Sequence, residues 1–274
     1  MTAIQPCALL FLVGPDWRVE TISLNAGLLE QGKPETLLGR PLTQLIGSNA
    51  IHALRNRMAW LSRAGSQIHD FGVRWGRCDV SFDIHARRRG DYFLIEAEPA
   101  VEGRLADGIG MVQSLLDRIN ADDVQDMAGQ GLRQLSALTG FNRLTLQSRA
   151  GIVIGRCERG SLPPATSEVS GKPCQSARIV ADCTSEAVPL LGHLDDALLG
   201  ETIFPAPSEE ELSQLSNQGV RAAMTLPLRI DGEWVGTIEA HHGVARRCGA
   251  ERRAVAGLFA DRLAARMARQ GWTP

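Results

Sequence analysis

Two adjacent histidines, His241 and His242, close an alternating apolar segment near the end of the chain. A neutral imidazole can exchange hydrogen bonds or ligate a metal, so either ring is a candidate contact for a bound cofactor. His241 or His52 would also serve as a haem ligand, because any neutral imidazole can bind haem iron. In the simpler interpretation, which we favour at this point, one imidazole of the pair packs inside the protein and the other is solvated.

Motifs that would indicate catalysis are absent from the sequence. It contains no Gly-x-Ser-x-Gly motif, no phosphate-binding loop, no Gly-x-Gly-x-x-Gly after a strand and no His-x-x-x-His helix. The adjacent acid pairs Asp122-Asp123 and Asp195-Asp196 fit helix caps or solvated turns better than a paired acid and base. We therefore predict that the chain is not an enzyme.

The six cysteines are scattered and form no Cys-x-x-Cys pair, which argues against a structural zinc site and against a disulfide framework. They are Cys7, Cys78, Cys157, Cys174, Cys183 and Cys248. The spacing of Cys157, Cys174 and Cys183 within one segment follows no known catalytic motif. A haem or redox sensor therefore ranks third among the functions considered below.

Composition and charge exclude some partners. The 274 residues are 44% hydrophobic and 22% charged, which is typical of globular proteins, and the length favours two domains. With a formal net charge of −2, the chain lacks the positive field that would hold nucleic acid or an anionic membrane. Apolar runs such as 8–13 are far too short to span a bilayer, and the N-terminus lacks the features of a signal peptide. We predict a cytoplasmic protein that binds neither nucleic acid nor membranes.

The first hundred residues predict an antiparallel sheet interrupted by short helices. Strands are expected at 8–13, 17–23, 68–75, 79–85 and 92–96. Between the second and third strands, residues 25–61 carry apolar side chains at helical spacing, most regularly over 49–61. Two strands, several short helices and then three strands are the order of elements in a PAS domain, which we place at residues 1–100.

The remaining residues, 101–274, predict a second domain of the α+β class. Helices are expected at 112–119, 122–140 and 250–270, and strands at 143–146, 152–154, 222–230 and 234–240. Asp122 or Asp123 can cap the second helix, which Gly140 would end. Asp231-Gly232 between two alternating runs predicts a type I′ hairpin turn. The segment 155–209 has little periodicity, as in a binding or lid region or a variable loop. This order of elements is GAF-like.

Four short motifs occur in an order that resembles one protein family. Ile4-Gln5-Pro6 precedes the first long strand, and Leu138–Arg143 reads L-T-G-F-N-R. Gly219–Met224 reads G-V-R-A-A-M, and Gly232–Gly236 is followed by Ala240-His241-His242. In this order and at these places, the motifs resemble the PAS–GAF photosensory core of bacteriophytochromes over nearly the whole chain. The resemblance implies a PAS domain followed by a GAF domain, each a mostly antiparallel sheet flanked by helices.

The sequence departs from that family where the family holds its chromophore. The family attaches biliverdin to a cysteine upstream of the I-Q-P motif, where only Met1-Thr2-Ala3 stand here, so we expect neither this attachment nor the knot that the same segment forms. Cys7, which we place on the first strand, is not expected to replace it. The family's pocket histidine corresponds to Glu211, interpreted chiefly as an acid favoured at a helix start. The family's pocket tyrosine corresponds to Gln147.

The arginines that hold the bilin propionates in the family have no clear counterparts. Lys172 and Arg178 are the nearby cations, and we favour a solvated surface position for both; the family's P-A-S-D-I-P motif aligns best with 164–169. We therefore expect bilin binding to be impaired or lost, with no cofactor. The alternative is a red/far-red photoreceptor that binds biliverdin or another bilin non-covalently. If a bilin binds, its contacts are expected from His241, His242, Glu211 and Gln147.

Because the resemblance ends at the closing helix of the GAF domain, with no PHY, kinase or cyclase domain after residue 270, we expect the chain to signal by contact with a protein partner. A homodimer through the 250–270 helix is one form of that contact. Small side chains recur on this helix at Ala256, Ala260, Ala264 and Ala268, and would let another helix approach closely. The alternative is that this stripe packs within the monomer.

Overall fold

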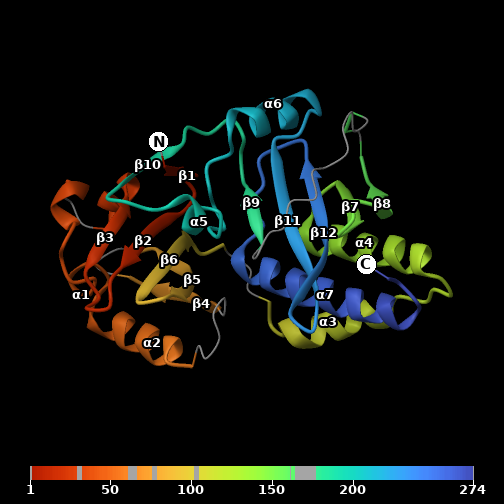
Figure 1. The fold of residues 1–274 in the computed structure, drawn as a ribbon, viewed down its shortest axis with the longest axis horizontal. Helices are drawn as coiled ribbons and strands as arrows, with labels where there is room; N and C mark the ends of the chain where they lie inside the picture. The colour runs from red at the N-terminus through yellow and green to blue at the C-terminus, as the bar shows by residue number, and fades with distance from the viewer. Residues whose placement is uncertain are drawn as a thin grey trace. The chain divides into compact units, whose positions relative to one another are not determined.

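The computed structural model describes residues 2–29, 33–60, 67–75, 79–101, 105–160, 162–163 and 177–273. The chain forms two compact units, of which unit 1 comprises 1–102 and 185–206, and unit 2 comprises 103–184 and 207–274 (Figure 1). Residues 185–206, here called the crossover segment, were assigned to the second domain from the sequence. In the structure they pack with the sheet of unit 1.

Unit 1 contains a seven-stranded antiparallel sheet in the order β1-β10-β3-β2-β6-β5-β4. Its strands are β1 (Ala3–Ile4), β2 (Leu9–Val13), β3 (Val19–Ser23), β4 (Gln67–Arg74), β5 (Ser81–Arg89), β6 (Tyr92–Pro99) and β10 (Val188–Leu191). Its helices are the 3-10 helices η1 (Leu24–Leu28) and η2 (Pro34–Leu37), with α1 (Thr43–Ile46), α2 (Ser48–Met58) and α5 (Asp196–Leu199). The two strands, short helices and three strands expected over the first hundred residues are present, and β10 from the crossover segment joins them.

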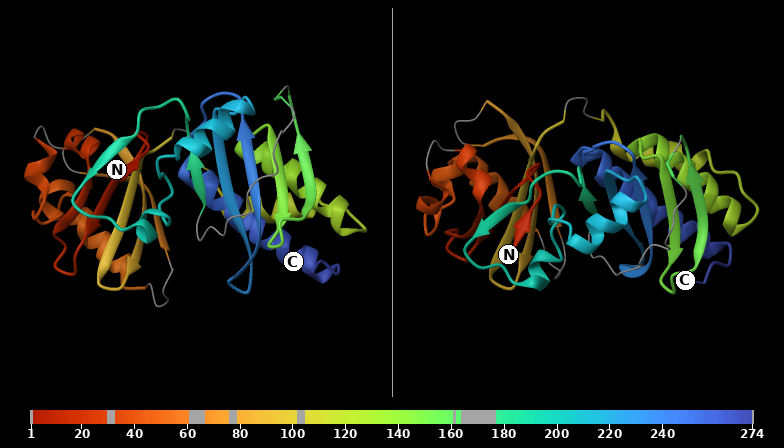
Figure 2. Two further views of the ribbon diagram at one scale, coloured as in Figure 1. Left: turned by 45° about the horizontal axis from the view of Figure 1, so that its top comes forward. Right: turned by 90° about the horizontal axis from the view of Figure 1, so that it is seen from above.

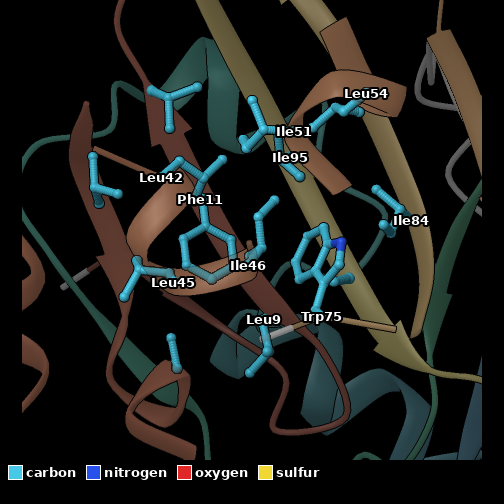
Figure 3. Packing of buried hydrophobic residues seen from close by; sticks show 14 of the residues in the cluster. Leu9, Phe11, Leu42, Leu45, Ile46, Ile51, Leu54, Trp75, Ile84 and Ile95 are labelled. Atoms are coloured by element: carbon cyan, nitrogen blue, oxygen red, sulfur yellow. The ribbon is translucent and has the colours of Figure 1, made fainter. Parts of the chain in front are cut away.

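The main core of unit 1 lies between one face of this sheet and the helices α1 and α2. Alternate residues of β2, such as Leu9 and Phe11, are buried there beside Ile46 and Trp75 (Figure 3). The rings of Phe11 and Trp75 meet edge to face with centroids 5.9 Å apart. This packing follows from the period of two along a strand, which sends every second side chain to the same face.

The crossover segment is held on unit 1 through Glu96 of β6. The Glu96 carboxylate is 2% exposed and accepts hydrogen bonds from the backbone N–H of Ile203, at 2.9 and 3.0 Å to its two oxygens, and of Phe204, at 3.2 Å. Arg89 of β5 donates to Glu201 at 2.5 Å. Three positions of the crossover segment are thus fixed by charged side chains of the sheet.

Unit 2 contains a five-stranded antiparallel sheet in the order β8-β7-β12-β11-β9. Its strands are β7 (Arg143–Ser148), β8 (Val153–Glu158), β9 (Arg178–Val180), β11 (Ala222–Ile230) and β12 (Glu233–His242). Its helices are α3 (Gly108–Asp117), α4 (Val124–Thr139), α6 (Glu209–Asn217) and α7 (Ala250–Arg269). Figure 2 shows α4 and α6 on opposite sides of this sheet. The α+β class predicted for both domains is confirmed.

The local signals predicted for unit 2 are present. Asp123 caps α4 by accepting from the N–H of Asp126 at 2.8 Å, and Gly140 ends the helix in the left-handed conformation with φ 73°. Asp231 and Gly232 both have positive φ, 53° and 88°, as a type I′ turn requires. The hairpin prediction is therefore confirmed.

The alanine stripe of α7 does not form an exposed surface. Ala256, Ala260 and Ala264 are each 0% exposed, because this face of α7 packs against β11 and against α3 and α4 of the same unit. These three alanines therefore pack within the monomer, which was one of the two alternatives, and a homodimer through the 250–270 helix stays a prediction. The exposed side of α7 carries Leu258, which is 41% exposed. In the part of the chain that the structure describes, no helix is both long and apolar enough to cross a bilayer.

Candidate functional site

One face of the unit 2 sheet is polar, and we call it the polar face. Along β7 the fully buried Leu144 and Leu146 alternate with Thr145 and Gln147, so the two sets point to opposite sides. The leucine side faces the helices, because a Cβ added at Gly155, the partner of Leu146, would lie 2.9 Å from the side chain of Ala128 in α4. The polar face is therefore the side of the sheet turned away from α4.

Strand register aligns the residues of this face in rows that cross the sheet. The first row is polar throughout and contains Thr145, Glu239, Thr225 and Arg178, from β7, β12, β11 and β9. The second row begins with the polar Arg143 and His241 and ends with the apolar Ala223 and Val180. Gln147 pairs with Thr237 in a third row. Polar groups that are buried on one surface need hydrogen-bond partners, and a bound ligand can supply them. This surface is therefore the candidate ligand-binding site.

The two adjacent histidines are separated by the sheet. His241 points to the polar face, is 6% exposed, and its Nε2 lies 3.6 Å from the carboxylate of Glu239. His242 points to the helix side, where its ring meets Phe141 edge to face and its Nδ1 accepts from the N–H of Val244 at 3.1 Å. Burial lowers the pKa of His242 below its usual value, and the charge of Arg246 lowers it further. The interpretation that one of the two rings is solvated is wrong, since His242 is also only 8% exposed.

Glu211 reaches the polar face from α6. It lies in the first turn of that helix, as predicted, and its N–H is bound by Ser208 Oγ at 3.2 Å. Its carboxylate accepts from Nη2 of Arg178 at 2.7 Å. The Nε of Arg178 is buried and has no hydrogen-bond partner in the described part of the chain. Arg178 is thus a half-buried, paired cation and not the solvated one that we expected; Lys172 lies outside the described residues.

Gln147 and Arg143 complete the polar face at β7. Gln147 is 2% exposed, and its buried Oε1 finds no hydrogen-bond partner among the described residues. Arg143 is buried and holds Glu158 of β8 with its Nε at 3.2 Å and the carbonyl of Pro163 with its Nη2. Its Nη1 is buried and has no partner in the same part of the chain. The face thus presents both an acceptor and donors that other groups can bind.

An ion pair that was not predicted joins the end of β9 to the start of β11. Arg221, the arginine of the G-V-R-A-A-M motif, donates to both carboxylate oxygens of Asp182 at 2.9 and 2.8 Å. The hydrogen bond from Arg221 holds the pKa of Asp182 well below its usual range, and Thr184 adds to the effect. The G-V-R-A-A-M motif draws attention to Arg221. Its partner Asp182 lies 39 residues earlier, and no local sequence pattern identifies it.

No described thiol projects from the central strands of the polar face. Cys157 on β8 pairs with Leu144 on β7, which points to the helix side of the sheet, so Cys157 points there too. Cys183 lies beyond β9, where its Sγ donates to the carbonyl of Val220, and burial first, then the charge of Asp182, raises the pKa of its thiol. Cys7 lies in the turn between β1 and β2, not on the first strand as expected.

Two cysteines and one predicted motif fall outside the described residues. These are Cys78, Cys174 and the segment 164–169. Among the residues that are described, no group of three or more histidine, cysteine, aspartate or glutamate side chains is arranged to hold a metal ion.

Two family models match the chain. The PAS fold family matches residues 1–100, and the GAF domain family matches residues 123–267, which is more than half of the chain. The chain belongs to the GAF domain family. It is similar to the phytochrome-like protein Cph1 of Synechocystis sp., with 27% identity over 87% of this chain and 36% of that protein. The chain therefore spans about a third of the length of this curated relative.

Solved structures show the same fold. The chromophore-binding domain of the bacteriophytochrome RpBphP3 from R. palustris matches with a TM-score of 0.76 and 22% identity, over 98% of this chain and 95% of that one. The photosensory core module of the Stigmatella aurantiaca phytochrome matches with a TM-score of 0.75 and 21% identity, over 98% of this chain and 58% of that one. The chain has the PAS–GAF fold of these chromophore-binding cores, and the resemblance drawn from its motifs is confirmed.

The expectation that no cofactor binds is contradicted by these comparisons, because the relatives are phytochromes and their matching parts are named as chromophore-binding or photosensory. The expectation rested on single positions where this sequence lacks the family's residues. It placed Arg178 on the solvated surface and left out Arg143, whereas the fold places both arginines on one face. Loss of a residue type at one aligned position does not remove that type of group from a site.

Proposed function

We propose that the chain is a photosensory domain that binds a linear tetrapyrrole, a bilin, on the polar face of its GAF sheet. The observation that carries the proposal is a set of buried polar atoms on that face that have no hydrogen-bond partner among the described residues: Gln147 Oε1, Arg143 Nη1 and Arg178 Nε. A buried polar atom without a partner costs about 1 to 3 kcal/mol, so a ligand that satisfies these atoms is favoured there.

The chemistry of these residues fits such a ligand. A bilin carries two propionate carboxylates, ring N–H groups and terminal carbonyl oxygens. Arg178 and Arg143 would hold carboxylates, His241 would hydrogen-bond a carbonyl, and the Oε1 of Gln147 would accept from a ring N–H. The conjugated system supplies absorption of visible light, and the protein residues fix its position and shield it from water.

We propose that this binding is non-covalent. A thiol must be deprotonated to add to a vinyl group, and the raised pKa of Cys183 works against this. Cys157 points to the opposite side of the sheet. Binding would then depend on hydrogen bonds and charge, and a denaturing solvent would release the pigment unchanged.

The test is reconstitution of the purified full chain with biliverdin, followed by absorption spectra before and after red light. We expect a stoichiometric complex with a sharpened long-wavelength band that light alters. Arg178→Gln should weaken binding by about 10- to 150-fold, the value of one charge-assisted hydrogen bond of about 1.5 to 3 kcal/mol. Arg133→Gln, the same change on an exposed residue of α4, is the control and should bind as the wild type does. A wild-type chain that binds no biliverdin would overturn the proposal.

We propose further that the output of the domain is contact with a second copy through the outer side of α3 and α7. A groove of about 660 Å³ runs between these helices. It is lined by Ile109, Val112, Gln113, Leu116, Asp117, Leu258, Arg262, Arg266, Arg269 and Gln270. Ile109 is 79% exposed, and apolar side chains at the surface in a groove favour an interface. Charges of both signs on one surface allow two copies related by a two-fold axis to complement each other.

Light scattering with size-exclusion chromatography tests this contact. We expect the wild-type chain to be a dimer and Leu258→Glu to be a folded monomer. Val244→Glu changes a side chain that is 55% exposed on the loop after β12, and should leave the dimer intact. A monomeric wild type, or a dimer in the Leu258 variant, would contradict the contact.

A further inference from the structure

We propose that Glu211 is an internal competitor for the ligand carboxylate, because its own carboxylate occupies the guanidinium of Arg178 that faces the polar site. The strength of the Arg178–Glu211 pair would then set the affinity for any ligand that carries a carboxylate. This inference rests on the proposed function, since it concerns regulation of the same site. It assigns Glu211 a role other than that of a helix-opening acid.

The geometry leaves room for exchange between the two carboxylates. Only one guanidinium nitrogen of Arg178 is engaged by Glu211, at 2.7 Å between Nη2 and Oε2. The side chains of the pair are 32% and 30% exposed, so water screens their attraction in part. The buried Nε of Arg178 has no partner in the described part of the chain. A guanidinium can bind a carboxylate with two parallel N–H groups, and the Nε–H of Arg178 is available as one of them.

The position of Arg178 directs it to the polar face. Its backbone on β9 pairs with Thr225 of β11, which in turn pairs with Glu239 of β12. Arg178 therefore ends the row of polar side chains that crosses the sheet. A carboxylate that binds along this row meets the same guanidinium that Glu211 holds.

The hold of α6 on the sheet is slight, which makes displacement of Glu211 feasible. This helix has nine residues, and one of them, Leu215, is buried, in a small cluster with Val180 and Val220. Three acids crowd its first turn: Glu209, Glu210 and Glu211. The helix N-terminus favours all three acids alike, so the hydrogen bond from Arg178 is the specific side-chain contact that the structure gives Glu211.

The experiment compares two ligands that differ only in their propionate groups. Biliverdin carries two carboxylates, and biliverdin dimethyl ester carries none. Dissociation constants are measured by absorption titration on the full chain. Glu211→Gln removes the competing charge and should tighten biliverdin binding by about 2- to 5-fold, the range expected for a partly exposed ion pair. It should leave the affinity for the ester unchanged. Glu209→Gln, the same change two residues earlier in an exposed position, is the matched control and should alter neither affinity.

Each outcome decides between the two proposals. Tighter biliverdin binding by Glu211→Gln, with no change for the ester, supports the competition. Unchanged biliverdin affinity in this variant, or an equal gain for the ester, overturns it while leaving bilin binding intact. If neither ligand binds to the wild type or to the variants, the proposed function fails and the competition fails with it. Circular dichroism melting curves verify that every variant is folded.

Discussion

The crossover segment should depend on one buried carboxylate, and Glu96→Gln is the change that tests this. Glu96 accepts from the N–H groups of Ile203 and Phe204 at 2.9 to 3.2 Å, and it is 2% exposed. An amide of the same shape retains one acceptor oxygen, but it turns an NH2 group toward backbone donors. Each hydrogen bond to a charged group contributes about 1.5 to 3 kcal/mol, so losing one and leaving a donor unpaired should cost about 2 to 4 kcal/mol.

Amide hydrogen exchange measures this loss where it occurs. Local opening of the crossover segment should become about 30- to 1000-fold more frequent in the variant, the equivalent of that free energy. Contacts from the residues around β1 remain, such as the hydrogen bond from the N–H of Gln5 to the carbonyl of Phe204 at 2.9 Å, so the segment should open more often without unfolding unit 1. Glu35→Gln, an exposed acid on η2, is the control. Unchanged protection of 185–206 in Glu96→Gln would refute the claim that this carboxylate holds the segment.

Three further changes probe unit 2. Gly131→Ala in α4 would place a Cβ 2.4 Å from a methyl of the buried Leu263; we expect overpacking to lower the free energy of unfolding by about 1 to 3 kcal/mol, offset by a helix-propensity gain of about 1 kcal/mol. Gly257→Ala in α7 is the control: its Cβ would have no atom within 4 Å, so this variant should only be stabilised, and equal melting temperatures for the two variants would contradict the reasoning. Burial raises the pKa of Asp261, so the folded state binds its proton more tightly and loses stability as pH rises through that pKa; Asp261→Asn should raise the melting temperature at pH 7 more than at pH 4 in calorimetry. Gly232→Val should cost about 1 to 2 kcal/mol in urea denaturation, because its φ of 88° strains any β-branched residue.

Local patterns predicted the elements of this chain well where short-range chemistry decides them. Asp123 and Gly140 bound α4 as their side-chain chemistry requires, and the Asp231-Gly232 turn forms the expected hairpin. The strand β5 was predicted too short, with a turn beginning at Ala86, because the arginines that end this strand read as a polar loop. Arg87 and Arg89 are covered because they pair with Glu201 in the crossover segment, and no local pattern reveals such a distant partner.

The candidate site was predictable in part. A period of two along β12 already implies that His241 and His242 face opposite sides, and this signal was missed when the pair was read as one packed and one solvated ring. The pairing of Glu211 with Arg178 was not predictable, because it joins residues 33 positions apart through strand and helix placement. Gln147 Oε1 has no hydrogen-bond partner among the described residues, and this too depends on which side chains the fold brings near it.

The segment between β9 and α6 connects the two features that these experiments perturb. Its crossover part is held on unit 1 by Glu96, and α6, which begins directly after it, carries Glu211 in its first turn. Only Pro207 and Ser208 separate the two. In the proposed competition, a bound carboxylate would release Glu211 from Arg178 and remove this contact from the first turn of α6. A ligand shifts a conformational equilibrium only through its different affinity for the two states, and the exchange of one carboxylate for another on Arg178 supplies such a difference.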